Sequence, residues 1–211
     1  MTKKKTDNNQ DHKKQDPEIN IVKEIVETIP YIVVAVLVVW LVVTFVGQRT
    51  QVSGSSMYDT LENGDNLWID KLSYRFHDPE RFDIIVFPFQ DSDVYYIKRI
   101  IGLPGETVQI EEDGTILIKE KNEDFYRLED RYAYYDGGQF RPAYEYDSSS
   151  DQYVPVTQEW TLGEDEYFVM GDNRNDSKDS RYEDVGLIKR KSLIGKAAIR
   201  IWPLSKFGKI D

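Results

Sequence analysis

The most hydrophobic stretch of the chain runs from Thr28 to Gln48 and contains no charged residue. An α-helix of this length reaches about 31 Å, roughly the hydrocarbon thickness of a bilayer. No polar face interrupts the stretch, which disfavours a buried helix of a soluble protein. A cleaved secretory signal would have a shorter apolar core, and Gly47-Gln48-Arg49-Thr50 offers no A-x-A-like cleavage site. The pattern therefore predicts one transmembrane anchor helix over residues 28–48.

Short apolar runs separated by glycine and proline follow the anchor, and helical periodicity is weak among them. Runs of this kind predict strands, and Asp113-Gly114 marks a hairpin between two of them. The expected strands cover residues 66–69, 83–87, 95–101, 107–110, 115–118, 167–170 and 196–202. The fold class is therefore mainly β: a folded antiparallel β-sheet or barrel domain with one N-terminal transmembrane helix.

Residues 122–160 interrupt this rhythm with tyrosines and acidic side chains. We interpret them as an inserted or elongated segment of the domain. Its tyrosines indicate that part of it packs, whereas Ser148-Ser149-Ser150 also fits a flexible acidic loop. The predicted organisation is a disordered tail over 1–27, the anchor over 28–48 and a β-rich domain over 49–211.

The flanking cations predict the direction of the anchor. Lys13, Lys14 and Lys23 precede the span, and only Arg49 follows it closely. Because cytoplasmic flanks carry the excess of Lys and Arg, we expect a single-pass protein of the cell membrane with a cytoplasmic N-terminus. The domain over 49–211 would then be extracytoplasmic.

Charge and composition exclude several functions. The net charge is −11, and lysines and acids balance over residues 1–28, so the excess negative charge belongs to the rest of the chain. An acidic domain repels phosphate backbones, and we expect no nucleic-acid partner. Cysteine is absent, no His/Cys cluster has metal-ligand spacing, and no glycine-rich phosphate loop occurs. We therefore expect no metal and no cofactor.

A hydroxyl-rich turn follows the anchor and offers Ser53, Ser55 and Ser56 as nucleophiles. A fully extended chain from Arg49 to Ser56 spans only about 24 Å, so a reactive serine here stays near the bilayer. A serine needs a general base. His12 falls in the tail and His77 falls in a polar turn, so the sequence does not favour histidine in that role.

A lysine can replace histidine if it is neutral. An ordinary lysine is neutral in only about one molecule in 2,500 at pH 7, and burial in an apolar strand lowers its pKa. Lys98 is the candidate, because apolar residues flank it within a predicted strand, and Lys196 is its rival. From the residues alone, Lys98 could also point to solvent, with Arg99 on the opposite face of the strand.

Three segments, in this order behind one span, resemble motifs of the bacterial type I signal peptidases, the leader peptidases that use a serine–lysine dyad. They are Ser56–Leu61 with Ser-Met-Tyr-Asp-Thr-Leu, Tyr96–Glu106 with Tyr-Ile-Lys-Arg-Ile-Ile-Gly-Leu-Pro-Gly-Glu, and Gly171–Arg181. Residues 81–87 and 194–208 are also similar. The resemblance implies a hydrolase, a serine endopeptidase that removes N-terminal signal peptides from exported preproteins at the outer membrane face. Its implied partners are preprotein signal peptides, the lipid bilayer and the secretion machinery.

The resemblance also implies roles for individual residues. Ser56 would be the nucleophile, with its backbone N–H in the oxyanion hole, and Lys98 would be the general base. Ser177 would hold the Lys98 amine by a hydrogen bond. Two ion pairs and two residues of shallow apolar pockets complete the expected site. The pairs are Asp172 with Arg99 and Asp179 with Arg181, and the pocket residues are Val52 and Ile97.

The chain departs from the family pattern at three positions. Asp59 stands where the family usually has proline, and Phe82 replaces a usual glycine. Gly54 stands where some members carry a serine that completes the oxyanion hole, and Ser53 or Ser55 could substitute for it. These departures leave two alternatives open. One is a Ser-Lys maturation peptidase with one dedicated surface-protein substrate, and the other is a catalytically silent, membrane-tethered binding domain.

Overall fold

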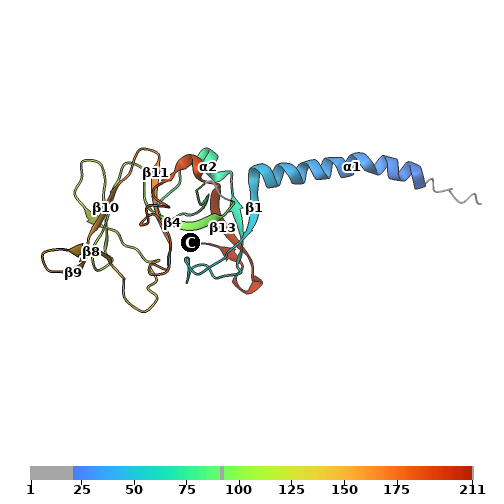
Figure 1. Cartoon of the computed structure of the whole chain (residues 1–211). Coiled ribbons are helices and arrows are strands. Elements are labelled where there is room, and N and C mark those ends of the chain that lie inside the picture. The colour runs from blue at the N-terminus through green and yellow to red at the C-terminus, as the bar shows by residue number, and fades with distance from the viewer. Residues whose placement is uncertain (1–20, 91–92, 211) are drawn as a thin grey trace, which may run out of the picture. The chain divides into compact units, whose positions relative to one another are not determined.

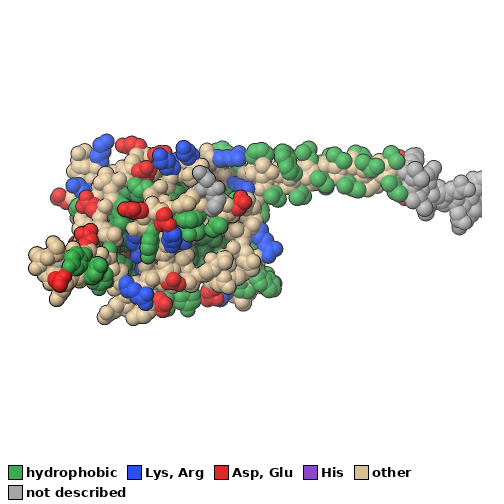
Figure 2. Space-filling model, in the orientation of Figure 1, with side chains coloured by type: hydrophobic (Ala, Val, Ile, Leu, Met, Phe, Trp, Pro, Cys, Tyr) green, Lys and Arg blue, Asp and Glu red, His purple; other side chains and the backbone are tan. Residues whose placement is uncertain are grey.

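The computed structural model describes residues 21–90 and 93–210, and the chain divides into the compact units Met1–Trp40 and Leu41–Asp211 (Figure 1). Helix α1 spans Ile21–Leu41 and continues as a π-helical turn, η1, over Val42–Val46. The stretch Glu24–Val46 has a mean hydropathy of 2.8 and is long and apolar enough to cross a membrane. Hydrophobic side chains cover this helix along its length (Figure 2).

The anchor helix ends two residues earlier in the chain than the hydrophobic pattern predicts, and the first strand begins there. The helical stretch ends at Val46, and Gly47 and Gln48 belong to strand β1, Gly47–Gln51. A Cβ on Gly47 would lie 2.5 Å from the Ile69 carbonyl oxygen and 2.7 Å from the Trp68 ring. The absence of a side chain at Gly47 therefore lets the chain enter the sheet immediately after the anchor.

The larger sheet has eight antiparallel strands in the order β1-β2-β13-β3-β4-β11-β12, with β14 paired to β13. Besides β1, its strands are β2 Asn66–Asp70, β3 Ile84–Pro88, β4 Tyr95–Gly102, β11 Glu166–Met170, β12 Ile188–Lys189, β13 Gly195–Trp202 and β14 Gly208–Lys209. Three short helical turns lie between strands: α2 Ser73–Phe76, η2 Arg190–Ser192 and η3 Leu204–Lys206.

The smaller sheet has four strands in the order β10-β5-β6-β7. They are β5 Thr107–Ile110, β6 Ile116–Lys119, β7 Tyr126–Arg127 and β10 Gln158–Thr161. A separate hairpin pairs β8, Ala143–Asp147, with β9, Gln152–Val156 (Figure 1). Three strands, β7, β8 and β9, therefore fall within residues 122–160, and β10 begins there. Ser148-Ser149-Ser150 lies in the turn between β8 and β9.

The mainly β, antiparallel fold class is confirmed. Each of the seven predicted strands corresponds to a strand of the structure within two residues at either end. The strands that the pattern did not predict are short or polar: β1, β7, β8, β9, β10, β12 and β14. These strands lack the apolar runs on which the prediction depends, and tertiary pairing determines them instead.

Alternation along β3 divides the core of the larger sheet between its two faces. Ile84 and Val86 belong to one buried cluster, and Ile85 and Phe87 belong to another. The first cluster also contains Val52, Met57 and Leu61 from the turn after β1. Burying a side chain of this size contributes about 1.5–3 kcal/mol, so this packing holds the turn firmly against the sheet.

Candidate active site

The hydroxyl-rich turn has a defined backbone conformation. The Val52 N–H donates to the Asp65 carbonyl at 2.8 Å, and the Leu61 N–H donates to the Met57 carbonyl at 2.7 Å. Met57 is only 2 % exposed, whereas Ser56 next to it is partly exposed. The turn therefore buries its apolar side chains in the core and presents Ser56 to a cleft of about 500 Å³.

Lys98 on β4 lies directly against this serine. Its Nζ is 2.7 Å from Ser56 Oγ and 2.9 Å from the Ile97 carbonyl oxygen. The lysine is only 4 % exposed. Burial lowers the pKa of the Lys98 ammonium to about 8, although the Asp179 and Asp172 carboxylates act to raise it. The pair therefore has the distance and the proton affinity that transfer from hydroxyl to amine requires.

The other candidate bases are not near Ser56. Lys196 Nζ forms an ion pair with the Asp83 carboxylate, which also accepts a hydrogen bond from the Tyr74 hydroxyl at 2.9 Å. His77 is exposed in the turn after α2, and His12 lies outside the described residues. Among the described residues, the geometry therefore favours Lys98 as the partner of Ser56.

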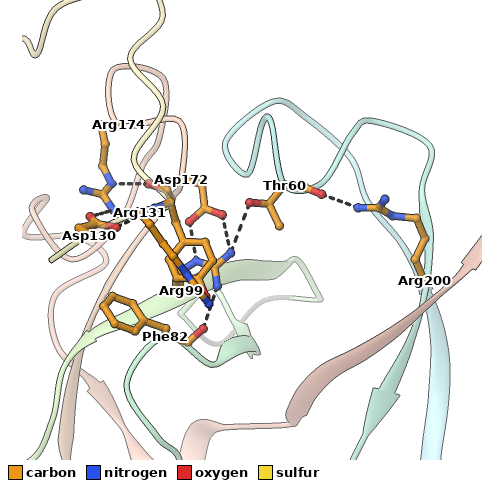
Figure 3. Close-up of polar contacts among 10 residues, drawn as sticks. Thr60, Phe82, Arg99, Asp130, Arg131, Asp172, Arg174 and Arg200 are labelled. Atoms are coloured by element: carbon orange, nitrogen blue, oxygen red, sulfur yellow. Dashed lines mark hydrogen bonds and ion pairs between the residues drawn. The ribbon is translucent and has the colours of Figure 1, made fainter. Parts of the chain in front are cut away.

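Arg99 and Asp172 form a wholly buried ion pair behind the dyad. Arg99 Nε and Nη2 donate to the two carboxylate oxygens of Asp172 at 2.8 and 2.7 Å, and neither side chain is exposed. The guanidinium also donates to the Phe82 carbonyl at 2.9 Å and to Thr60 Oγ1 at 3.3 Å (Figure 3). Arg99 thus connects β4 to the nucleophile turn and to the loop after β11.

Asp179 and Arg181 form the second expected ion pair. Arg181 donates to the two Asp179 carboxylate oxygens at 2.8 and 2.9 Å, and Asp179 is fully buried. Asp179 Oδ2 also accepts the Gly171 N–H at 3.0 Å. Asp179 therefore links the two ends of the loop between Gly171 and Arg181.

Ser177 is buried in this loop, with 6 % of its surface exposed. Its hydroxyl has no hydrogen-bond partner among the residues that the structure describes, so the expected bond to the Lys98 amine stays a prediction. A Cβ on Gly171 would lie 2.2 Å from Ser177 Oγ and 2.3 Å from the Ser56 carbonyl oxygen. Only glycine at 171 therefore lets the loop pack this closely against the nucleophile.

Val52 and Ile97 line the same cleft as Ser56 and Lys98. Val52 is buried, and Ile97 packs against the same apolar cluster. Both side chains therefore offer shallow apolar surface beside Ser56 and Lys98. Their substrate-binding role stays a prediction.

The backbone around Ser56 bears on the oxyanion hole. Gly54 has a φ of +101°, and no atom lies within 4 Å of a Cβ built on it. Ser55 Oγ donates to Asp176 Oδ2 at 2.5 Å, so the hydroxyl of Ser55 is engaged, while Ser53 is exposed. The Asn173 N–H donates to the Ser56 carbonyl at 3.1 Å and fixes the peptide after the nucleophile.

The other two departures from the family pattern leave the dyad in contact. Asp59 is exposed at the protein surface and is not buried beside Lys98. Phe82 has a φ of +71°, a left-handed conformation that glycine adopts most easily. This conformation gives a physical reason for the usual glycine. The Phe82 N–H donates to Ile100, and its carbonyl accepts from Arg99, both at 2.9 Å.

Several residues around the site carried no signal in the sequence. Thr60 binds Arg99, and Arg200 on β13 forms a hydrogen bond with the Thr60 carbonyl (Figure 3). Arg200 also forms an ion pair with Asp65. Tyr132 lies over the Arg99 guanidinium, with Arg99 Cζ 3.6 Å from the ring centroid. These contacts join residues far apart in the chain, so no local spacing could reveal them.

Comparisons with known proteins show which family the chain is similar to. The sequence model of the family described as "Signal peptidase, peptidase S26" matches residues 25–202. A probable signal peptidase I-2 of Synechocystis sp. (strain ATCC 27184 / PCC 6803 / Kazusa) is 37 % identical over 205 residues, covering 93 % of this chain and 80 % of that protein. Signal peptidase I S of Bacillus subtilis (strain 168) is 33 % identical over 190 residues, covering 90 % and 95 %. A crystal structure of a signal peptidase I from Enterococcus faecalis V583 is 33 % identical, with a TM-score of 0.39 over 57 % of this chain and 97 % of that one.

Proposed function

The chain belongs to the signal peptidase family, peptidase S26, and from this premise we propose that it cleaves N-terminal signal peptides from exported preproteins as a membrane-anchored serine endopeptidase. One observation carries the proposal: the buried Lys98 amine lies 2.7 Å from the Ser56 hydroxyl. This geometry lets a serine act as a nucleophile without histidine or a metal ion.

The reaction follows from the positions of the two groups. Neutral Lys98 accepts the proton of Ser56 Oγ as this oxygen attacks the scissile carbonyl carbon. The Ser56 backbone N–H donates to the oxyanion of the tetrahedral intermediate. The Lys98 ammonium then returns the proton to the departing amine, which leaves an acyl-enzyme. Water, deprotonated by Lys98, attacks the ester carbon. The Lys98 ammonium then returns this proton to Ser56 Oγ as the cleaved signal peptide leaves as a carboxylic acid.

The substrate is an extended peptide with small side chains near the scissile bond. Val52 and Ile97 line the cleft that contains the dyad, and Ile97 packs against the apolar cluster to which Val52 belongs. Small residues at the A-x-A-like end of a signal peptide suit such a surface. A bulky side chain would meet the packed core beneath Val52.

The anchor defines where cleavage occurs. We propose that the residues before Thr28 lie on the cytoplasmic side, that the apolar helix from Thr28 to Val46 crosses the bilayer, and that the chain from Gly47 onward is the peptidase domain on the outer face. The cations before the span support this direction. Preproteins emerge there from the secretion machinery, with which we propose that the enzyme associates. Ser56 follows the anchor closely, so its substrates also lie at the membrane.

The test is cleavage of a model preprotein by the purified full-length enzyme in detergent. Ser56→Ala and Lys98→Ala should each lose cleavage, whereas His77→Ala, which changes an exposed turn, should retain it. Chelators should have no effect on the rate. Cleavage by both dyad variants at the wild-type rate would refute the assignment, and chelator-sensitive cleavage would indicate a metal-dependent mechanism.

A further inference from the structure

An aromatic side chain of the elongated segment 122–160 covers the buried cation behind the dyad. Arg99 Cζ lies 3.6 Å from the centroid of the Tyr132 ring, and Tyr132 is partly buried. The Phe82 ring packs beside it, with the two ring centroids 5.3 Å apart. The flat face of the guanidinium therefore rests on Tyr132.

This contact adds a constraint that the hydrogen bonds of Arg99 do not supply. Those bonds lie along the edge of the guanidinium and join it to Asp172, Thr60 and Phe82 (Figure 3). They fix the group within its own plane. The Tyr132 ring limits movement perpendicular to that plane, and a desolvated cation gains electrostatic stabilisation from an aromatic face.

The same segment also pairs with the loop that follows β11. The Tyr134 N–H donates to the Asp172 carbonyl at 2.8 Å, and the Arg174 N–H donates to the Tyr134 carbonyl at 2.9 Å. Asp130 and Arg174 form an ion pair whose side chains are only 8 % and 1 % exposed. The elongated segment therefore binds this loop through backbone hydrogen bonds and through a buried ion pair.

The loop after β11 contacts the backbone of Ser56. The Asn173 N–H donates to the Ser56 carbonyl, and a Cβ on Gly171 would meet the same oxygen. The Tyr134 ring also meets the Tyr58 ring edge to face, with centroids 4.9 Å apart. A continuous set of contacts thus runs from the elongated segment to the backbone of the nucleophile turn.

We propose that residues 130–134 form a positioning element of the active site, in which Tyr132 acts as a positioning residue that holds Arg99 and, through it, the alignment of Ser56 with Lys98. The inference rests on the proposed function. Tyr132 does not touch the cleft: among the described residues that line it, none belongs to 122–160. Its removal should therefore slow the chemical step and leave substrate binding nearly unchanged.

The expected size of the effect follows from the sensitivity of catalysis to distance. A displacement of about 1 Å between reacting groups lowers the rate on the order of 100-fold. The bonds from Arg99 to Asp172 remain in Tyr132→Ala, so the displacement should be smaller. We expect Tyr132→Ala to lower kcat at least about tenfold, with KM changed less than about twofold.

The experiment compares three variants of the full-length enzyme in detergent, with a peptide that spans a signal-peptide cleavage site as substrate. Tyr132→Phe keeps the ring face and loses only the bond that its hydroxyl accepts from Arg131, at 2.7 Å, on the exposed side. It should restore kcat to within about twofold of wild type. Tyr153→Ala is the matched control, because this tyrosine of β9 is 72 % exposed. It should behave as wild type.

Rates are compared per folded molecule, at a temperature well below each measured Tm. Should Tyr132→Ala not fold, Tyr132→Leu replaces it, since leucine keeps apolar volume without an aromatic face, and the same loss of kcat is expected. The inference is overturned by unchanged kcat, by a loss confined to KM, by Tyr132→Phe as slow as Tyr132→Ala, or by an equal loss in Tyr153→Ala. Its failure is distinct from that of the proposed function, in which wild type would not cleave or Ser56→Ala would still cleave.

Discussion

Replacing Lys98 with methionine should abolish cleavage and at the same time stabilise the folded domain. Burial lowers the pKa of Lys98 from 10.5 to about 8. The difference of about 2.5 pKa units, at about 1.36 kcal/mol per unit, corresponds to roughly 3.4 kcal/mol against folding with the amine protonated. Methionine fills similar space without that penalty.

The amine also makes favourable contacts that methionine loses. Lys98 Nζ contacts Ser56 Oγ and the Ile97 carbonyl, and losing these partners costs about 1 kcal/mol. The net gain for Lys98→Met is therefore about 2 kcal/mol at pH 7. For a domain of this size, that gain raises Tm by roughly 4–8 °C.

The gain should depend on pH with a definite sign. Between pH 8 and pH 10.5 the unfolded wild-type chain binds a proton at Lys98 that the folded chain does not. The wild type therefore gains stability as pH rises through this window. The advantage of Lys98→Met is complete below about pH 8 and shrinks as the pH approaches 10.5.

Thermal unfolding in detergent, followed by circular dichroism at several pH values, measures this difference. Lys196→Met is the matched control, because its amine is paired with the buried Asp83 carboxylate. That substitution leaves the buried Asp83 carboxylate without its cationic partner and should lower Tm. The reasoning is refuted if Lys98→Met unfolds below wild type at pH 7, or if its advantage is the same at pH 7 and pH 10.

Two further predictions concern activity. The neutral form of Lys98 is the base, and its pKa is about 8. The value of kcat/KM should therefore rise about tenfold per pH unit below pH 8 and level off above it, and His77→Ala should show the same profile. A midpoint near 6.5 that appears in the wild type but not in His77→Ala would point to histidine instead. Gly171→Ala should lower kcat by on the order of 100-fold, because its Cβ would lie 2.3 Å from the Ser56 carbonyl oxygen and push the nucleophile turn away, and wild-type kcat in a folded variant would contradict this.

The hydrophobic pattern predicts the strands that carry the core and misses those that surround it. Strands β3 and β4 carry runs of branched apolar residues, and the burial of those residues follows from that composition. The hairpin of β8 and β9 presents tyrosines and acids, and three of these tyrosines are more than half exposed. Its pairing depends on contacts between the two strands and not on an apolar run, so the sequence pattern could not locate it.

The candidate site divides in a similar way. Ser56 and Lys98 could be selected from the sequence only through the resemblance to a known family, because the residues alone also offered other serines and Lys196. The choice between Lys98 and Lys196 could not be made from flanking residues alone. It depends on the partner of each amine: Lys196 Nζ is paired with the Asp83 carboxylate, whereas Lys98 Nζ contacts the Ser56 hydroxyl. The place of Tyr132 over Arg99 likewise depends on how a segment without a motif folds back on β4.

The buried charges behind the dyad explain why the Tyr132 ring matters to the domain. A buried ion pair such as Arg99 with Asp172 contributes little net stability, because desolvation offsets most of the attraction. Lys98 is itself destabilising, so stability around the site must come from apolar packing and from closing the polar cluster away from water. Arg99 binds Thr60 and Asp172, which lie 39 and 73 residues away in the chain, and so joins the nucleophile turn to the loop after β11. Tyr132 covers the Arg99 guanidinium, so the geometry of the dyad depends on a segment that contributes no group to the chemistry.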